Sequence, residues 1–333
     1  MIKFTIVIPV HNGMPYIKEC LESALNQDYK NYNIIILENM SNDGIVEYIE
    51  SLNSDIISIV KSDKLLDIDG NWSRIKDLEM NEYMTILMAD DKLEPNYLSS
   101  IVELINKHPK CNSFRTNLIS ISQKGDKLGF SSIKEKITIQ DYLKGRLKHT
   151  YFETAAGYTF KTQRYKEIGG FDCKFGLMHT DDKLFMEVIG KNNYMAVAKK
   201  YAAYYRCHEK SESRVSAFDN AIGGYNYWLN WIYNLNDFKL RNIVKYYLPY
   251  HLKQISHFYS QEELEKHKEI YKLYKINEDD LLHKWVNYKI KSKTRKNSTT
   301  LFLKQIFSVR NEYRDNTKRK IFTIFGIKLS FRV

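Results

Sequence analysis

The chain has 333 residues, of which 43% are hydrophobic and 27% charged, and its formal net charge is +11. Only 14 Gly and 5 Pro, and apolar stretches no longer than a strand, argue against a collagen-like, low-complexity or membrane-spanning chain. Residues 283–333 contain fourteen Lys and Arg against two acidic residues, so this end carries +12 and the rest of the chain −1.

The first hundred residues alternate between strand and helix patterns. Apolar, β-branched runs predict buried strands at Phe4–Val10, Asn33–Leu37, Asp55–Val60 and Tyr83–Met88. Helical spacing of apolar residues predicts helices at Tyr16–Asn26, Ile45–Leu52, Gly70–Met80 and from Pro95 to about Lys107. Strands that alternate with helices of this length predict βαβ units, a parallel sheet and therefore an α/β fold.

The pattern beyond residue 108 is less regular. It predicts strands at Asn112–Ser122 and Ala155–Lys161 and a helix at Leu184–Gly190. From about Ser216 to Lys293 the pattern is that of amphipathic helices rich in Tyr and Trp. The sequence therefore predicts a first domain of residues 1–215, a helical region of residues 216–293 and a basic tail of residues 294–333.

Two features predict a cytoplasmic protein. The four cysteines (Cys20, Cys111, Cys173 and Cys207) are far apart and lack zinc-site spacing, which is typical of reduced thiols. The N-terminus has a single Lys before the first strand pattern and lacks the pattern of a signal peptide.

Polar residues follow three of the predicted strands. His11 stands after the first strand, Glu38 and Asn39 after the second, and Asp90 and Asp91 after the fourth. Ligands of open parallel sheets bind at the carboxyl ends of the strands. No Gly-rich phosphate loop follows the first strand, which disfavours a Rossmann dinucleotide site and a P-loop kinase. Adjacent carboxylates repel unless a hard divalent cation shares them, so the sequence predicts a nucleotide site with a cation that neutralises a diphosphate.

Seven short segments carry a family resemblance. They are Ile6–Gly13, Leu37–Gly44, Gly70–Arg74, Leu87–Asp91, Gly169–Asp172, Thr180–Asp182 and Tyr205–His208. In this order and at this spacing they resemble bacterial family 2 glycosyltransferases, over about residues 1–215. The resemblance implies the GT-A fold, a mostly parallel central sheet flanked by helices. It also implies inverting transfer of a sugar from a nucleotide-diphospho-sugar to a hydroxyl of a growing glycan.

The resemblance assigns roles at the donor site. The residues that would contact the donor are Pro9, His11, Glu38, Asn39, Asn71, Arg74, Asp90 and Arg206. Asn39 would hydrogen-bond the nucleobase, at a position where many relatives carry Asp, and Pro9 and His11 would form the wall of its pocket. Asp90 would contact the ribose or support the metal. For Asn71 and Arg74, a helix cap and a helix-surface cation are equal alternatives.

The resemblance also assigns the metal and the base. Asp91 would bind Mn²⁺ or Mg²⁺, and His208 would be a further ligand of the metal or the diphosphate, since imidazole suits Mn²⁺. Asp181 would be the catalytic base that takes the proton of the acceptor hydroxyl. Asp182 is the alternative base and is otherwise expected to cap the following helix.

The end of the chain leaves alternatives open. Lys318–Val333 alternates basic and apolar residues, which fits a terminal strand or hairpin. It equally fits contact with an anionic membrane surface, in which case the protein is peripheral on the inner face of the plasma membrane and the acceptor is a lipid-linked glycan. A basic, non-catalytic nucleic-acid-binding protein is the alternative from another class, but no RRM, KH or helix-turn-helix signature is found, so we expect no nucleic acid. Met88 and Thr180 stand where many relatives have acidic residues, which leaves open a degenerate transferase that only binds glycans.

Overall fold

The computed structural model describes residues 1–148, 150–151, 156–208, 218–255 and 268–274, and the backbone of three strands between residues 307 and 332. The chain divides into two compact units, one of residues 1–139 and 153–228 and the other of residues 140–152 and 229–333. The domain boundaries expected from the sequence stay a prediction. The charged segment Lys291–Thr300 lies outside the described residues.

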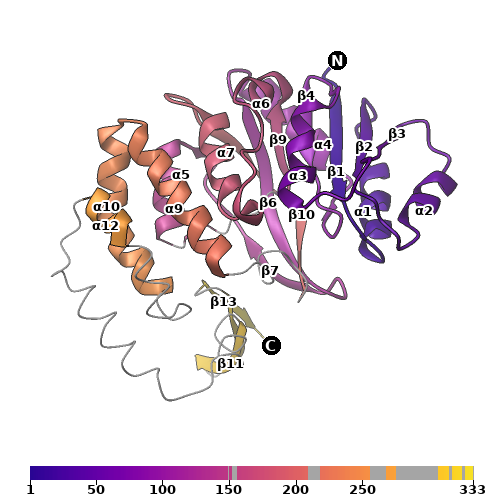
Figure 1. Ribbon diagram of the computed structural model, residues 1–333. Coiled ribbons are helices and arrows are strands. Elements are labelled where there is room, and N and C mark those ends of the chain that lie inside the picture. Colours follow the sequence, from indigo (N-terminus) through magenta and orange to yellow (C-terminus); the bar gives the residue numbers. More distant parts are fainter. Residues whose placement is uncertain are drawn as a thin grey trace. The chain divides into compact units, whose positions relative to one another are not determined.

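The first unit begins with the alternation that the sequence predicts. Its strands are β1 (Phe4–Val10), β2 (Tyr32–Glu38), β3 (Ile57–Val60) and β4 (Tyr83–Ile86). Its helices are α1 (Tyr16–Leu25), α2 (Ile45–Ser51), α3 (Ile68–Ser73), which continues into the 3₁₀ turn η1 (Arg74–Asp77), and α4 (Tyr97–Lys107). All seven residues of β1 are buried, because helices cover both faces of the sheet (Figure 1). A strand covered on both faces is uniformly apolar, and this explains why it was recognised from its sequence.

The sheet continues through six further strands. These are β5 (Lys92–Leu93), β6 (Ser113–Ser122), β7 (Lys127–Ser131), β8 (Lys136–Ile137), β9 (Tyr158–Lys161) and β10 (Met195–Cys207). The order is β3-β2-β1-β4-β9-β6-β10-β5, with β7 beside β6 and β8 beside β10. The pairs β2–β3, β1–β2, β1–β4 and β6–β10 are parallel, so the predicted α/β class with a mostly parallel central sheet is confirmed.

Strand β10 is the largest element that the sequence pattern did not predict. Exposed Lys199 and Lys200 interrupt its apolar run. The pairing of β10 with β6 shifts register between Ala198 and Ala203, so a bulge places these lysines outside the core. A periodicity of two residues is lost across such a bulge. For this reason the sequence pattern does not predict β10, and only its last residues stand out, as part of the Tyr205–His208 motif.

The first unit also contains α6 (Thr162–Glu167), the short 3₁₀ turn η2 (Phe175–Leu177) and α7 (Thr180–Ile189). Helix α7 is held against the sheet by aromatic packing: the Phe185 ring lies parallel to the Tyr158 ring of β9, with centroids 3.8 Å apart. The Arg115 guanidinium of β6 lies 4.7 Å from the same Tyr158 ring. This packing fixes the helix whose first turn carries Asp181.

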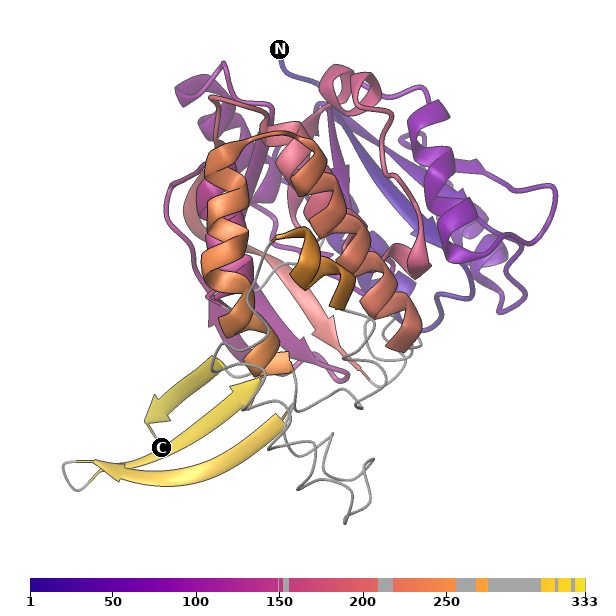
Figure 2. The same cartoon turned by 60° about the vertical axis from the view of Figure 1, so that its left-hand side comes forward.

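The second unit contains α5 (Ile139–Leu147), the end of α9 (Phe218–Asn234), α10 (Phe238–Ile255) and α12 (Lys268–Leu273). It ends in an antiparallel sheet of β11 (Phe307–Arg314), β12 (Thr317–Ile324) and β13 (Ile327–Arg332), seen side by side in Figure 2. Strands β12 and β13 pair from Ile324 with Ile327 to Arg319 with Arg332, which agrees with the strand-or-hairpin interpretation of the terminal segment.

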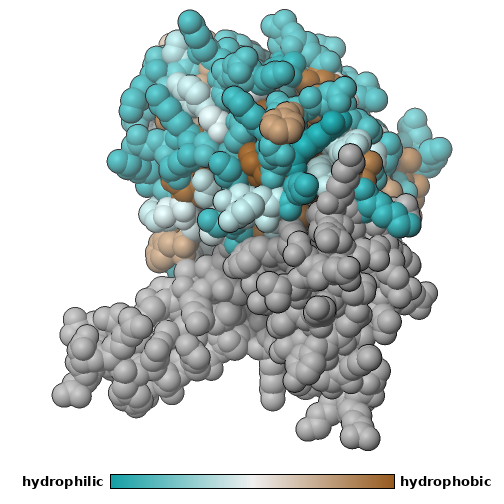
Figure 3. Space-filling model, turned by 90° about the vertical axis from the view of Figure 1, so that its left-hand side faces the viewer, coloured by the Kyte–Doolittle hydropathy of each residue, from teal (hydrophilic) through white to brown (hydrophobic). Residues whose placement is uncertain are grey.

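The described residues include no helix that combines the length and the apolar character needed to cross a membrane. On the face shown in Figure 3, most described side chains are hydrophilic and the apolar ones are scattered among them. Single exposed apolar residues are normal on a protein surface.

Candidate active site

The predicted site residues gather at one edge of the main sheet. Strands β1, β2 and β4 are mutually parallel and therefore end at the same edge. Strand β9 is antiparallel to both β4 and β6, so β6 and its parallel neighbour β10 run in the same direction as β1. Helix α7 leads back into β10, and so it begins at this edge as well. The carboxyl ends of the strands therefore collect Asn39, Asp90, Arg206 and His208, and the start of α7 adds Asp181.

Asp90 and His208 form a pair at this edge, in which the Asp90 side chain is partly exposed and the His208 side chain is 9% exposed. An Oδ2 atom of Asp90 lies 2.8 Å from Nε2 of His208, and 31% of the Asp90 side chain is exposed. The His208 ring stacks on the Tyr16 ring of α1, with centroids 5.1 Å apart. This stacking fixes the plane of the imidazole and aims its nitrogen at the carboxylate.

Asp91 is the buried member of the acidic pair. The residue is 1% exposed, and its Oδ1 accepts a hydrogen bond of 2.8 Å from the backbone N–H of Arg206. Its Oδ2 is buried without a hydrogen-bond partner. Burial and, after it, the neighbouring charge of Asp90 raise the pKa of Asp91 well above its usual range.

These residues fit a divalent cation. A carboxylate oxygen and an imidazole nitrogen are donors that suit Mn²⁺, and a cation nearby would offset the charge of the orphaned Asp91 oxygen. Within the residues that the structure describes, no group of three or more His, Cys, Asp and Glu forms a complete metal site. Asp90 and His208 would therefore hold the cation together with oxygens from a substrate or water.

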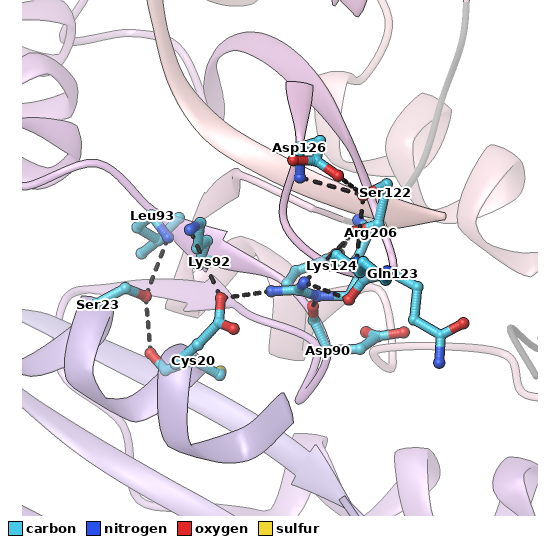
Figure 4. A network of polar contacts seen from close by, with 12 residues as sticks. Cys20, Ser23, Asp90, Lys92, Leu93, Ser122, Gln123, Lys124, Asp126 and Arg206 are labelled. Carbon is cyan, nitrogen blue, oxygen red and sulfur yellow. Dashed lines mark hydrogen bonds and ion pairs between the residues drawn. The ribbon is translucent and has the colours of Figure 1, made fainter. Parts of the chain in front are cut away.

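Arg206 is a buried brace of the site. It is 1% exposed, and each of its guanidinium nitrogens donates to a protein oxygen (Figure 4). Nε donates to the carbonyl of Asp90 at 2.7 Å, one terminal nitrogen to the carbonyl of Gln123 at 3.1 Å and the other to the Glu19 carboxylate at 2.7 Å. The arginine therefore ties β10 to the end of β4, the β6–β7 turn and α1, whereas the sequence predicted a contact with the donor.

Asn39 is also engaged within the protein. It is 3% exposed, its Nδ2 donates to the carbonyl of Leu66 at 2.8 Å, and its Oδ1 accepts from the N–H of Leu66 at 3.0 Å. Its own carbonyl lies 2.8 Å from Nδ1 of His11, which is exposed, whereas Pro9 is buried in β1. The side chain that was predicted to meet a nucleobase thus cross-links two segments of backbone.

Arg74 and Asn71 hold the ends of β2 and β3 together. The Arg74 guanidinium donates to the carbonyls of Glu38, Val60 and Lys61 at 3.1, 3.1 and 2.9 Å. It also donates to the Asn71 side chain at 2.9 Å, and Asn71 is 4% exposed. Glu38 is buried, and its carboxylate accepts from the N–H of Ser41. The arginine is therefore neither a surface cation nor free to face a ligand with these donors.

The two remaining candidates, Asp181 and Asp182, both lie in the first turn of α7 and differ in their burial. Asp182 is 0% exposed, and its carboxylate lies 2.8 Å from Nδ1 of His179. Asp181 is partly exposed, and its Oδ1 accepts from the N–H of Asp182 at 2.9 Å. The helix begins at Thr180, four residues before the predicted start at Leu184, so both carboxylates lie within the helix. Of the two residues, Asp182 is fully buried and Asp181 is partly exposed.

A left-handed turn precedes α7. Phe175, Gly176, Leu177 and His179 have φ angles of 56°, 60°, 63° and 61°. Each residue with a side chain costs about 1–2 kcal/mol in this conformation. Asp69 of α3 accepts hydrogen bonds from the N–H groups of Gly176 and Leu177, at 3.0 and 2.9 Å. Sequence reasoning missed Asp69, because its partners lie more than a hundred residues further along the chain.

Two glycines of α9 explain how this turn is accommodated. A Cβ atom on Gly223 would lie 2.6 Å from the Phe175 ring, and one on Gly224 would lie 2.0 Å from the Met178 carbonyl. Neither position can carry a side chain without displacing the turn. The Gly–Gly pair, unfavourable inside a helix, is therefore a requirement of the turn next to α7.

The Gly169–Asp172 segment supports the same helix. The Asp172 carboxylate contacts Nζ of Lys183 at 2.7 Å and also accepts from the Tyr227 hydroxyl. The Phe171 ring packs edge-on against the Trp72 ring of α3, with centroids 5.1 Å apart. This segment thus connects α3, α7 and α9.

With the geometry established, comparison with known proteins defines the class. Residues 5–165 match the model of "Glycosyl transferase family 2", and this part of the chain belongs to that family. The fold is the α/β GT-A fold: the crystal structure of Staphylococcus aureus TarS residues 1–349 superposes with a TM-score of 0.65 at 14% identity, covering 99% of each chain. The predicted fold and family are therefore confirmed.

Curated relatives match over shorter stretches. An uncharacterized glycosyltransferase of Rickettsia typhi is 33% identical over 103 residues, which cover 31% of this chain and 32% of that one. Glycosyltransferase GlyA of Streptococcus pneumoniae is 28% identical over 116 residues, 31% of this chain and 15% of that one. A GalNAc(5)-diNAcBac-PP-undecaprenol beta-1,3-glucosyltransferase of Campylobacter jejuni is 22% identical over 173 residues, 50% of this chain and 56% of that one. The chain thus spans a third or less of the first two relatives.

Proposed function

We propose that the protein is an inverting, cation-dependent glycosyltransferase that transfers a sugar from a nucleotide-diphospho-sugar to a hydroxyl of a growing glycan. The observation that carries the proposal is the Asp90–His208 pair, 2.8 Å apart at the carboxyl-end edge of a family 2 domain. Solved relatives of the same fold bind such donors: TarS has been crystallised with UDP-GlcNAc, and a mannosyltransferase of Pyrobaculum calidifontis (TM-score 0.50, 14% identity, covering 87% of this chain and 84% of that one) with GDP-Man and Mn²⁺.

The metal ligands in this proposal are Asp90 and His208. The sequence assigned the metal to Asp91 and a donor contact to Asp90, but Asp91 is 1% exposed and its Oδ1 is engaged by Arg206. Asp90 is accessible, and for this reason we give it the role of ligand. A bound Mn²⁺ or Mg²⁺ would supply positive charge to the departing diphosphate. Asp91 keeps the Asp90 turn in place through its bond to the β10 backbone.

The catalytic base in this proposal is Asp181. It is the partly exposed residue of the two in the first turn of α7, while the Asp182 carboxylate is buried against His179. Asp181 takes the proton of the acceptor hydroxyl as the hydroxyl oxygen bonds to the anomeric carbon. The bond from that carbon to the diphosphate oxygen breaks in the same displacement, and the electron pair leaves with the nucleotide. A single displacement inverts the anomeric configuration.

The acceptor class in this proposal is a cell-surface or lipid-linked glycan. The Campylobacter relative is named for an undecaprenol-linked acceptor, and an Erwinia amylovora relative, 31% identical over 110 residues (32% of this chain and 36% of that one), for amylovoran biosynthesis. The +12 charge of residues 283–333 suits an anionic surface, where each basic residue contributes about 1 kcal/mol. Sedimentation with anionic and neutral vesicles tests this: a K318E/R319E/K320E variant of the full chain should bind anionic vesicles more weakly, and equal binding would remove the membrane contact.

The central experiment is a panel of nucleotide sugars incubated with the full chain and Mn²⁺. We expect release of the nucleoside diphosphate from one donor, abolished by chelation of the cation. Asp181→Asn keeps the shape of the side chain but cannot accept a proton, so it should lower transfer about 10²-fold or more while donor affinity stays close to that of the wild type. Failure of every donor, or full turnover in the chelated protein, would contradict the proposed function.

A further inference from the structure

The left-handed turn Phe175–Leu177 lies two residues before the helix that carries Asp181, and a residue of α3 binds its backbone. We infer that Asp69 of α3 is a positioning residue for the catalytic base. The inference rests on the proposed function, since it assumes that Asp181 is the base. It adds a residue that neither the family motifs nor the sequence pattern pointed to.

Asp69 binds the turn with both carboxylate oxygens. Oδ2 accepts from the N–H of Gly176 at 3.0 Å, and Oδ1 accepts from the N–H of Leu177 at 2.9 Å. Successive N–H groups in a turn of this kind form a concave site for an anion, and here the anion is a side chain of the same protein. A carboxylate satisfies both donors, whereas an amide offers only one acceptor atom. The contact therefore depends on the chemistry of aspartate and not only on its size.

Side-chain contacts of the two neighbours of Asp181 connect it to the turn. Thr180 is the residue immediately before Asp181, and its Oγ1 donates to the carbonyl of Leu177 at 2.7 Å. On the other side, Asp182 is fully buried and pairs with His179 at 2.8 Å. The backbone of Asp181 is therefore held on both sides, and the hydrogen bonds that Asp69 accepts fix the segment from which these contacts are made.

The N-terminal end of α3, to which Asp69 belongs, is also tied to the donor edge of the sheet. Asp67 caps this helix by accepting from the N–H of Gly70 at 2.8 Å. The preceding residue, Leu66, is the one whose backbone is bound by both amide atoms of Asn39 at the end of β2. The first turn of α3 thus connects the edge where the strands end to the left-handed turn that precedes α7, the helix that carries Asp181. Through Asp69, this connection sets where the carboxylate of Asp181 stands relative to the donor.

The inference predicts a loss in turnover without a loss in donor binding. In Asp69→Asn, one of the two N–H groups loses its acceptor and faces an amide N–H₂ instead, so the turn and Asp181 move. Misplacement of a reacting group by about 1 Å costs on the order of 10²-fold in rate, so we expect kcat to fall by about 10- to 100-fold with the KM for the donor within about twofold. Asp77→Asn, which removes the same charge from an exposed residue of η1, should keep the wild-type kcat.

A double-mutant cycle shows whether Asp69 acts through Asp181. If it does, Asp69→Asn added to Asp181→Asn should lower the residual turnover no further. The same fold-loss in both backgrounds, or an unchanged kcat in Asp69→Asn, would overturn the inference. Asp69→Glu keeps the charge and lengthens the side chain, so it should also lower kcat. Donor binding shows whether Asp69→Asn is folded, and Asp69→Glu replaces it in the test if it is not.

Hydrogen exchange provides a readout that does not depend on turnover. The N–H groups of Gly176 and Leu177 should exchange faster in Asp69→Asn than in the wild type and in Asp77→Asn, and unchanged protection would contradict the role of the carboxylate. Full turnover in Asp181→Asn would instead refute the proposed base itself. Loss in Asp181→Asn together with full turnover in Asp69→Asn would refute only the positioning role.

Discussion

Replacement of Arg206 by lysine tests the brace at the centre of the site. Lysine keeps the charge but has a single nitrogen, which cannot reach three acceptors that lie in different directions. The Asp90 carbonyl loses a donor at 2.7 Å, and a carbonyl left unsatisfied costs about 1–3 kcal/mol. The Gln123 carbonyl loses a donor at 3.1 Å, but Gln123 is exposed and its carbonyl can bond to water, so this adds about 1 kcal/mol or less. The Glu19 side chain is 48% exposed and turns to water, so its loss also adds about 1 kcal/mol or less. The total is about 1–5 kcal/mol of unfolding free energy.

Urea unfolding followed by circular dichroism measures this loss. Glu19→Gln is the matched control, because it removes only the half-exposed partner and should cost about 1 kcal/mol or less. Arg206→Lys should also weaken Mn²⁺-dependent turnover, since the Asp90 carbonyl would no longer be held. A stability of Arg206→Lys within about 0.5 kcal/mol of the wild type, or an equal loss in Glu19→Gln, would refute the argument that the buried guanidinium holds these backbone segments together.

Three further outcomes are expected. Asp90→Asn should abolish Mn²⁺-dependent turnover, whereas Asp91→Asn, whose oxygen still accepts the same backbone N–H, should keep measurable turnover; the reverse result would return the metal to Asp91. Asn39→Asp replaces a donor by a carboxylate that faces a backbone carbonyl, so it should lower the unfolding free energy by about 1–3 kcal/mol, measured by urea denaturation, and an unchanged value would contradict the cross-link. Burial is the largest single influence and raises the pKa of Asp172, but the hydrogen bonds from Lys183 and Tyr227 and the charges of Lys183 and Lys174 together outweigh it and lower the pKa below the ordinary value. The native state therefore binds fewer protons than the unfolded state, so this stabilisation should fade as the pH falls below about 4, and thermal melts between pH 5 and 2 should show a shallower decline for Asp172→Asn.

The elements of the first unit were predictable where one local rule decides the structure. The β1 run is apolar at almost every position because both faces are covered, and the α4 run follows helical spacing with six buried residues. Strand β10 was missed because the Lys199–Lys200 bulge breaks the period. Helix α7 was predicted to start too late, because its first turn consists of polar residues that the tertiary structure buries, such as Asp182.

The candidate site was predictable in its location and much less so in its contacts. The topology of a parallel sheet brings strand ends together, so Asp90 and His208 could be expected at one edge. Whether a polar side chain faces a ligand or the protein depends on distant backbone groups, as for Arg206 with the Gln123 carbonyl. The same limit applies to Asp69, whose acceptor role is decided by a left-handed turn far along the chain. No local pattern contains that information.

The cross-link made by Asn39 has a consequence for engineering and for the assignment of donors by alignment. With both amide atoms bound to the Leu66 backbone, the Asn39 side chain is needed to hold the fold together at this edge. Libraries that diversify position 39 to change donor preference would therefore select mainly for stability. Preference is better altered at an exposed neighbour such as Met40, which is 50% exposed. For the same reason, the residue type at position 39 reflects the needs of the fold as well as any contact with the nucleotide.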